Sequence, residues 1–204
     1  MASYRRSQKT RKKILEAALK LFSQKGFLGA TTKEIAAEAG IAEVTLFRYF
    51  PSKKLLFQEV INTFSFLPKL KEIIKAHKDS PYEDALMHIA LSFLQLLEEN
   101  KDLIRIMHSE MKRYPDEIKK IHDSVVENTI KLLGNYFEEL QKKGILREFK
   151  QELAARAFLG MLYSYFYLKE IRGEEKFKRD ELVEIVKAYV NFFAYGTVLK
   201  KDNS

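Results

Sequence analysis

The run TTKEIAAEAGIAEVTLFRYFPSKKLL, residues 31–56, decides the fold of this chain. One of the two threonines at its start is placed to cap a short helix over residues 33–39. Gly40 then allows a tight turn into a second short helix over residues 42–50, and a Pro-Ser pair separates that helix from another that begins at Lys53. Two short helices joined by a glycine turn predict a helix-turn-helix, whose last helix fits the major groove of DNA.

The flanking sequence predicts further helices and no strand. A first helix is expected from Lys9 to Lys25, and the helix from Lys53 is expected to run through Phe64 until Pro68 breaks or kinks it. The remaining helices are expected over residues 69–77, 81–99, 101–112, 116–143, 151–172 and 179–199. An all-α fold follows, because no alternating strand pattern stands out.

The composition limits the classes of protein to which this chain can belong. The 204 residues are 46% hydrophobic, so the chain can bury a core, and the absence of cysteine excludes disulfides and thiolate metal sites. No apolar run of about 18 residues is present, which predicts no membrane-spanning helix. No signal peptide is visible either, and we expect a cytoplasmic protein. Phosphate loops, His-Glu-x-x-His and nucleophile motifs are missing, so we expect neither an enzyme nor a cofactor.

The positive charge is confined to one end of the chain. Residues 1–58 hold 12 Lys and Arg against 4 Glu, a net charge of +8, whereas the rest holds 24 basic and 24 acidic residues. Basic side chains beside a DNA-reading motif contact phosphates and displace counterions. Residues 4–13 are the most basic stretch, and they form either a flexible arm that reaches the minor groove or a solvated tail.

Residues 31–56, with the preceding residues 14–18, 21–22 and 25–27, strongly resemble the DNA-binding domain of the TetR family of repressors. The resemblance covers roughly residues 10–57. It implies a helix-turn-helix domain over residues 1–55 and a helical ligand-binding and dimerisation domain over residues 56–204. It also implies a repressor that leaves a palindromic operator when a small apolar or amphipathic effector binds. An architectural or non-specific DNA-binding protein without ligand control is the alternative.

Carried over by position, the resemblance predicts the DNA contacts. Tyr49 and Lys53 resemble the family's phosphate clamps. Glu43 either reads a cytosine amino group or pairs with Lys33 or Arg48, and we favour the ion pair. Phe47 is either a base contact or a packing residue. The full predicted set is Thr32, Lys33, Ala42, Glu43, Val44, Thr45, Phe47, Arg48, Tyr49 and Lys53.

The last two helices are apolar over too wide an arc for a surface helix. A two-helix face from each of two subunits would form a four-helix interface, and Gly160 would permit close approach of the helices. The alternative is that these residues form the core of one protomer. The predicted homodimer interface consists of Phe158, Leu162, Tyr165, Phe166, Tyr189, Phe192 and Phe193.

An effector site is expected among the middle helices, because methionines and aromatic residues make adaptable apolar walls. The candidates are Phe64, Phe66, Met87, Ile104, Met107, His108, Met111, Phe137 and Tyr163. Such residues at helical spacing equally suit an ordinary core. The four histidines show no spacing typical of a metal site, so we expect no bound metal.

Overall fold

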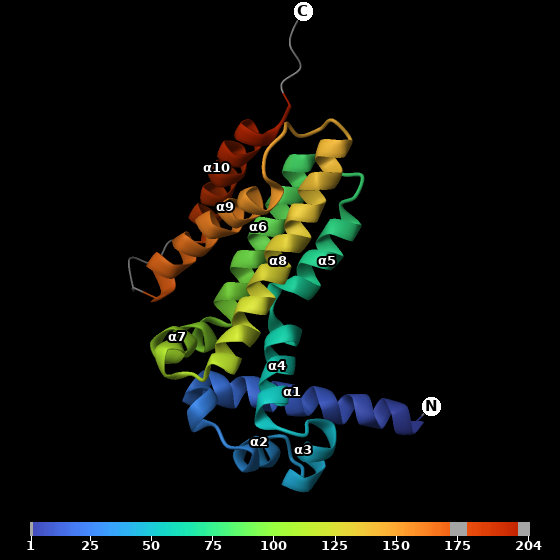
Figure 1. The fold of residues 1–204 in the computed structure, drawn as a ribbon, viewed down its shortest axis with the longest axis vertical. Coiled ribbons are helices and arrows are strands. Elements are labelled where there is room, and N and C mark those ends of the chain that lie inside the picture. The colour runs from blue at the N-terminus through green and yellow to red at the C-terminus, as the bar shows by residue number, and fades with distance from the viewer. Residues whose placement is uncertain (1, 172–178, 200–204) are drawn as a thin grey trace, which may run out of the picture. The chain divides into compact units, whose positions relative to one another are not determined.

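The computed structural model describes residues 2–171 and 179–199, which are helical apart from turns (Figure 1). No β-strand occurs within this described part, although an isolated antiparallel bridge joins Leu146 and Val198. The all-α prediction is confirmed. The chain divides into a head unit, residues 1–64 and 100–124, and a second unit, residues 65–99 and 125–204.

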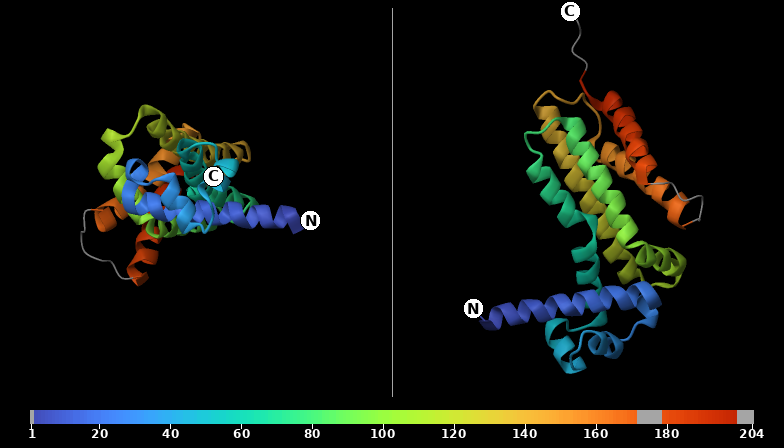
Figure 2. Two further views of the ribbon diagram at one scale, coloured as in Figure 1. Left: turned by 90° about the horizontal axis from the view of Figure 1, so that it is seen from below. Right: turned by 180° about the vertical axis from the view of Figure 1, so that it is seen from behind.

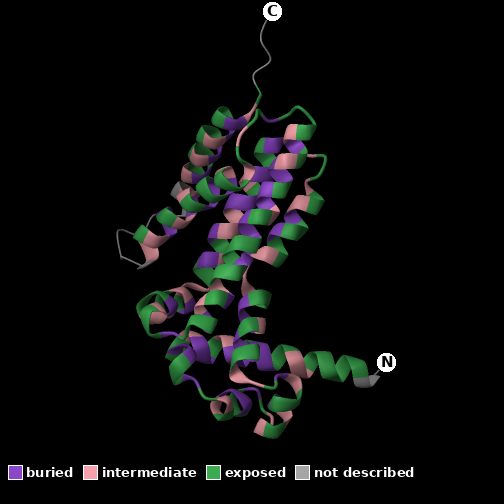
Figure 3. Ribbon diagram, viewed as in Figure 1, coloured by how far each residue is buried: buried purple, intermediate pink, exposed green. Residues whose placement is uncertain are grey.

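The head unit is built around an aromatic cluster. Its helices are α1 (Ala2–Gly29), α2 (Thr32–Glu38), α3 (Glu43–Tyr49), α4 (Lys53–Phe64), α7 (Lys101–Glu110) and the start of α8 (Asp116–Lys142), with a 3-10 turn at Met111–Arg113. Phe57 lies with its ring centroid 5.1 Å from both Phe22 and Phe27. All three side chains are buried, and every helix of this unit contributes buried residues (Figure 3).

α1 begins earlier than predicted, and residues 4–13 are helical turns within it. The prediction of a flexible basic arm is therefore wrong. Arg, Lys and Gln favour the helix, and no glycine or proline interrupts the stretch. Residues 4–9 are nevertheless exposed, so this end of α1 is a solvated, positively charged helix.

α1 bends at Gly26, where φ is 69° and ψ is 176°. A Cβ at this position would overlap the carboxylate of Glu110, so α7 packs directly against the bend. The next residue, Phe27, donates its backbone N–H to the hydroxyl of Tyr114 over 3.2 Å. The bend thus turns Phe27 into the core and brings the end of α1 against α7 and the residues that follow it.

The break predicted near Pro68 is present three residues earlier. α4 ends at Phe64, Ser65 is extended, and α5 runs over Phe66–Ala76 instead of the predicted residues 69–77. Pro68 stands in the first turn of α5. A backbone N–H has no helical partner there, so proline is tolerated.

The second unit has its core around Phe137. It comprises α5, α6 (Tyr82–Glu99), the rest of α8, α9 (Gln151–Phe166), a π-helical turn (Tyr167–Ile171) and α10 (Arg179–Thr197). The Phe137 ring lies 5.7 Å from that of Phe193 and 6.3 Å from that of Tyr82. At the end of α10, Arg147 N–H donates to the Thr197 carbonyl over 2.9 Å, beside the Leu146–Val198 bridge. No helix in the described residues combines the length and apolarity needed to cross a membrane.

Gly26→Ala should destabilise the protein more than Gly40→Ala. Both glycines have φ of 69°, but a Cβ at Gly40 would meet no atom within 4 Å. We expect a loss of about 1 kcal/mol at Gly40 from the positive φ alone, and about 2–4 kcal/mol at Gly26, where a clash is added. Urea unfolding measures both. In a Glu110→Ala background, Gly26→Ala should lower the free energy of unfolding by less, because the clashing carboxylate is gone. An equal loss in both backgrounds would show that Glu110 does not cause the clash.

Candidate nucleic-acid interface

α2 and α3 form the predicted helix-turn-helix and lie together on one side of α1 (Figure 2). Gly40 makes the turn with φ of 69°, and Ile41 N–H donates to the Ala36 carbonyl over 3.0 Å. The apolar side chains between the two helices form a small core and are buried except Ile41, which is half-buried. The buried members are Ile35, Ala36, Ala39, Leu46 and Phe50.

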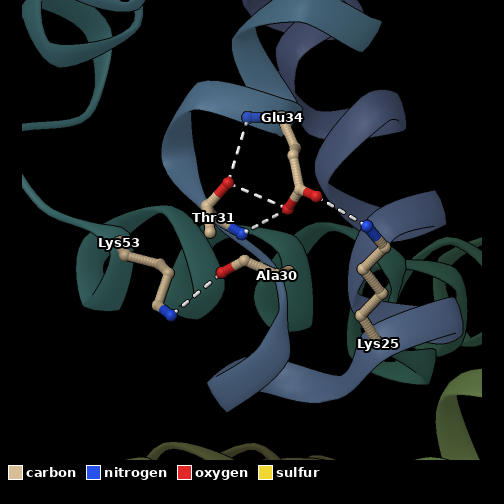
Figure 4. Close-up of polar contacts among 5 residues, drawn as sticks. All are labelled: Lys25, Ala30, Thr31, Glu34 and Lys53. Carbon is tan, nitrogen blue, oxygen red and sulfur yellow. Dashed lines mark hydrogen bonds and ion pairs between the residues drawn. The ribbon is translucent and has the colours of Figure 1, made fainter.

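The start of α2 carries a complete capping box (Figure 4). Glu34 N–H donates to Thr31 Oγ1 over 3.2 Å, and Thr31 N–H donates to Glu34 Oε2 over 3.0 Å. Lys25 from α1 donates to the other carboxylate oxygen of Glu34 over 2.6 Å. The hydrogen bond from Lys25, followed by those from Thr31, lowers the pKa of Glu34 to about 2. The Glu34 carboxylate of the capping box is therefore ionised at neutral pH.

The outer face of α3 is open to solvent at Val44, Phe47 and Arg48. Val44 is 70% exposed and Phe47 is 41% exposed, while Leu46 between them is fully buried. Arg48 is exposed and Thr45 is half-buried. The face combines an apolar surface, a hydroxyl and a guanidinium, which are the groups that read base edges and thymine methyls.

Glu43 makes a different contact from the one predicted. Its carboxylate accepts a hydrogen bond of 2.6 Å from the hydroxyl of Thr32, and no ion pair joins it to Lys33 or Arg48 in the described residues. The predicted ion pair is wrong because Thr32, at the start of α2, lies nearer to the carboxylate. The bond ties the first residue of α2 to the first residue of α3.

Lys53 is half-buried, and its ammonium contacts the residues at the end of α1. Its ammonium donates to the carbonyl of Ala30 over 3.0 Å (Figure 4). It also lies 4.7 Å from the centre of the Phe27 ring. A longer contact of 3.5 Å reaches the carbonyl of Leu28. Loss of hydration on burial lowers the pKa of Lys53.

The remaining predicted DNA-contact residues are Lys33, Ala42 and Tyr49. Lys33 and Ala42 are exposed, and Ala42 is the N-cap residue of α3. Tyr49, the last residue of α3, is half-buried.

Arg11 lies in the stretch predicted as a flexible arm or a solvated tail, but it is half-buried and joins α1 to α4. Its guanidinium pairs with Glu59 of α4 and lies 5.4 Å from the centre of the Phe50 ring. Arg11 stands three and four residues before the buried Ile14 and Leu15. That helical spacing was the available signal that Arg11 faces inward.

The predicted effector residues divide between the two units. In the head unit Met107 is buried, and His108 is exposed on α7, where partial loss of hydration and then His122 lower its pKa. In the second unit Phe66 packs on Phe93 with ring centroids 4.9 Å apart, and Phe137 is fully buried. The half-buried candidates are Phe64, Ile104 and Met111 in the head unit and Met87 and Tyr163 in the second unit.

The residues predicted for a dimer interface also fall into two groups. Four of them lie in the core of the protomer itself: Phe158, Leu162, Tyr165 and Phe166. Phe193 is half-buried against Phe158, and Tyr189 is half-buried. Phe192 alone of this set is largely exposed, at 75%. Tyr195 and Leu153, which were not in the predicted set, are also largely exposed.

No group of three or more His, Asp or Glu side chains placed to hold a metal ion occurs in the described residues. Polar and cationic side chains, among them Lys33 and Arg48, lie exposed on α2 and α3. That chemistry suits a polyanion.

The stability contributed by Glu34 should depend on pH. Because folding lowers its pKa from 4.5 to about 2, the contribution is present above pH 4.5 and is lost as the pH falls toward 2. Glu34→Gln should therefore melt at a lower temperature than the wild type at pH 7, and the difference should shrink between pH 4.5 and 2. In a Lys25→Met background that pH window should narrow, since Lys25 is the largest cause of the shift. A difference in melting temperature that does not change with pH would show that the ionised Glu34 carboxylate is not its source.

Both parts of the chain match known protein families. Residues 14–60 match the model described as bacterial regulatory proteins, tetR family, and residues 84–197 match that of the AefR-like transcriptional repressor, C-terminal domain. The uncharacterized HTH-type transcriptional regulator YvkB of Bacillus subtilis is 31% identical over 157 residues, which cover 77% of this chain and 81% of the relative.

Solved structures share the fold over nearly the whole chain. A putative TetR-family transcriptional regulator from Mesorhizobium loti has a TM-score of 0.79 at 24% identity, and the match covers 95% of this chain and 99% of that one. The flavonoid-responsive regulator FrrA has a TM-score of 0.70 at 24% identity, over 94% of this chain and 98% of that one.

Proposed function

This chain belongs to the TetR family of bacterial regulatory proteins, and we propose that it is a repressor that binds a palindromic operator as a homodimer. The family consists of DNA-binding transcription regulators, so the chain is a regulator and not an enzyme. One observation carries the finer proposal. A capped helix-turn-helix presents the outer face of α3, with Val44, Phe47 and Arg48, to solvent.

Base reading is proposed for the centre of that face. The hydroxyl of Thr45 and the guanidinium of Arg48 can hydrogen-bond to base edges, and Val44 and Phe47 can contact thymine methyls. Phosphate contacts are proposed for Lys33 and Tyr49 and for the chain around Thr32 and Ala42. These groups lie at helix starts or at the end of α3, where they flank the reading surface.

Thr45→Ala and Lys33→Met should affect DNA binding differently. Loss of the Thr45 hydroxyl should change the preferred base at one position of each half-site, at a cost of about 1–3 kcal/mol on the selected sequence. Loss of the exposed Lys33 charge should weaken binding to all sequences and lower the slope of log affinity against log salt by about 0.9 per subunit. Selection from genomic fragments, followed by titration at several salt concentrations, measures both effects.

The same selection tests the operator. A specific dimeric repressor should protect two half-sites related by twofold symmetry, with centres about 34–36 Å apart. An unsymmetrical footprint would contradict the dimer. Equal recovery of all fragments at raised salt would favour an architectural DNA-binding protein instead.

Dimerisation is proposed through α9 and α10. On α10, Phe192 and Tyr195 are each 75% exposed, and Leu153 of α9 is 60% exposed. Gly160 is exposed on α9, and a Cβ there would meet no atom within 4 Å. Glycine weakens a helix by about 1 kcal/mol relative to alanine. Its presence at an open position is explained if a second copy packs closely on α9.

Phe192→Glu should convert the dimer to a monomer. The carboxylate would be buried without a partner between the two copies, which costs several kcal/mol across a twofold interface. Sedimentation velocity measures the change. Phe47→Glu is the matched control, because Phe47 is an exposed aromatic residue of the head unit and its replacement should leave the mass unchanged. A dimer that survives Phe192→Glu places the interface elsewhere.

Repression and control by a small molecule are supported by the comparisons. The C-terminal match is to a transcriptional repressor domain, and the similar regulator FrrA is described as flavonoid-responsive. We propose a small apolar or amphipathic effector, because the second unit is rich in aromatic side chains. The effector must bind the DNA-free form more tightly, typically by about 1–3 kcal/mol. Mass spectrometry of material that co-purifies with the protein searches for it directly.

A further inference from the structure

Two histidine side chains from different helices meet in the second unit. His77 is the C-cap residue of α5, and His88 lies in α6. Their ring centroids are 4.2 Å apart, and the ring planes are inclined to each other by 39°. The packing of α5 on α6 creates this pair, and the spacing of the two residues along the chain does not indicate it.

The hydrogen bonds of the two rings leave the same nitrogen atom open on each. His77 Nδ1 lies 3.1 Å from the carbonyl oxygen of Ile73, and His88 Nδ1 lies 2.9 Å from that of Asp84. A carbonyl oxygen can only accept, so each Nδ1 donates, and each Nε2 keeps its lone pair in the neutral ring. Metal-binding histidines have the same arrangement, because the N–H donated to a carbonyl sets the tautomer and the ring orientation.

The distance between the rings suits two ligands of one ion. With a metal–nitrogen distance of about 2.0–2.1 Å, two imidazoles at neighbouring coordination positions have ring centroids roughly 4.5–5 Å apart. The observed 4.2 Å is close to that range, so small rotations of the rings would let both Nε2 atoms reach one ion.

The helices that carry the pair are held by buried residues on both sides of the contact. α5 and α6 lie side by side and are joined by the short segment 77–81 (Figure 2). Ile73 is buried one turn before His77, and Ala85 and Ile89 are buried on either side of His88. The rings themselves lie at the surface, since His88 is exposed and His77 is half-buried. An ion in solution can therefore reach them.

We propose that His77 and His88 form a chelating site for a divalent transition-metal ion of the type of Zn²⁺, Ni²⁺ or Cu²⁺. Imidazole nitrogen suits these ions, whereas Mg²⁺ and Ca²⁺ prefer oxygen ligands. Water completes the coordination, and the exposed Asp84, one turn before His88 on α6, adds negative charge beside the ion. The bound ion joins the end of α5 to α6. This inference is independent of the proposed DNA binding.

The test is a calorimetric titration of the full, untagged chain with Zn²⁺, and with Mg²⁺ as the control ion. His77→Gln and His88→Gln each remove one ligand. His122→Gln is the matched control, because it removes a histidine of the head unit whose side chain is 40% exposed. Either loss at the pair should weaken Zn²⁺ binding by about 100-fold, since the second imidazole binds an ion that the first already holds. His122→Gln should bind Zn²⁺ as the wild type does, and Mg²⁺ should not bind at this site.

Thermal unfolding gives a second readout. At a free Zn²⁺ concentration about ten times its dissociation constant, the melting temperature of the wild type should rise by about 3–5 °C. His88→Gln should melt like the wild type without metal, because the side chain is exposed, and should show no such rise with Zn²⁺. Electron paramagnetic resonance with Cu²⁺ should detect two imidazole nitrogens in the wild type and one fewer in either variant.

Three results would overturn the proposal. The first is a wild type that does not bind Zn²⁺ more tightly than His88→Gln does. The second is an equal loss of affinity in His122→Gln, which would place the ion elsewhere. The third is a Cu²⁺ spectrum that the loss of His88 leaves unchanged. If His77→Gln fails to fold because α5 loses its C-cap residue, the comparison of His88→Gln with the wild type decides.

Discussion

α1 bends at Gly26, whose backbone is left-handed, and the placement of α2 and α3 depends on this bend. At Gly26 the backbone leaves the helical path and turns Phe27 toward Phe57. Glu110 fills the space where a side chain would stand, so the same bend also seats α7. Within five residues the chain reaches Thr31, the cap of α2. A different path at Gly26 would move the start of α2 away from α4.

α2 and α3 depend strongly on their surroundings because they are short. α2 and α3 have seven residues each, too few to be stable as isolated helices in water. Their order comes from caps and from contacts with longer helices. Glu34 joins α2 to α1 through Lys25, and Glu38 does so through Lys20 over 2.6 Å. Polar contacts of this kind orient α2 against α1 and add no apolar surface to the exposed face of α3.

In the second unit, helical periodicity predicted which positions are apolar but not which of them are buried. The wide apolar arcs of α9 and α10 indicated more than an ordinary surface, but they did not say which residues face the protomer's own core. Phe158 and Leu162 are fully buried in it, while Phe192 is 75% exposed. Both kinds of position carry the same aromatic side chain, so the apolar pattern of the sequence did not separate them.

Local features were determined by the sequence alone. The Gly40 turn, a threonine cap for α2 and the ends of α2 and α3 depend on residues within a few positions of one another, and the all-α fold followed from patterns of this kind. The starts of α1 and α5 differed from the predicted ones. Only the tertiary structure decided the partners of Arg11, Lys53 and Glu43, which lie 48, 23 and 11 residues away. A long side chain finds such a partner only after the helices have packed, so its direction is a consequence of the fold and not of its neighbours in the chain.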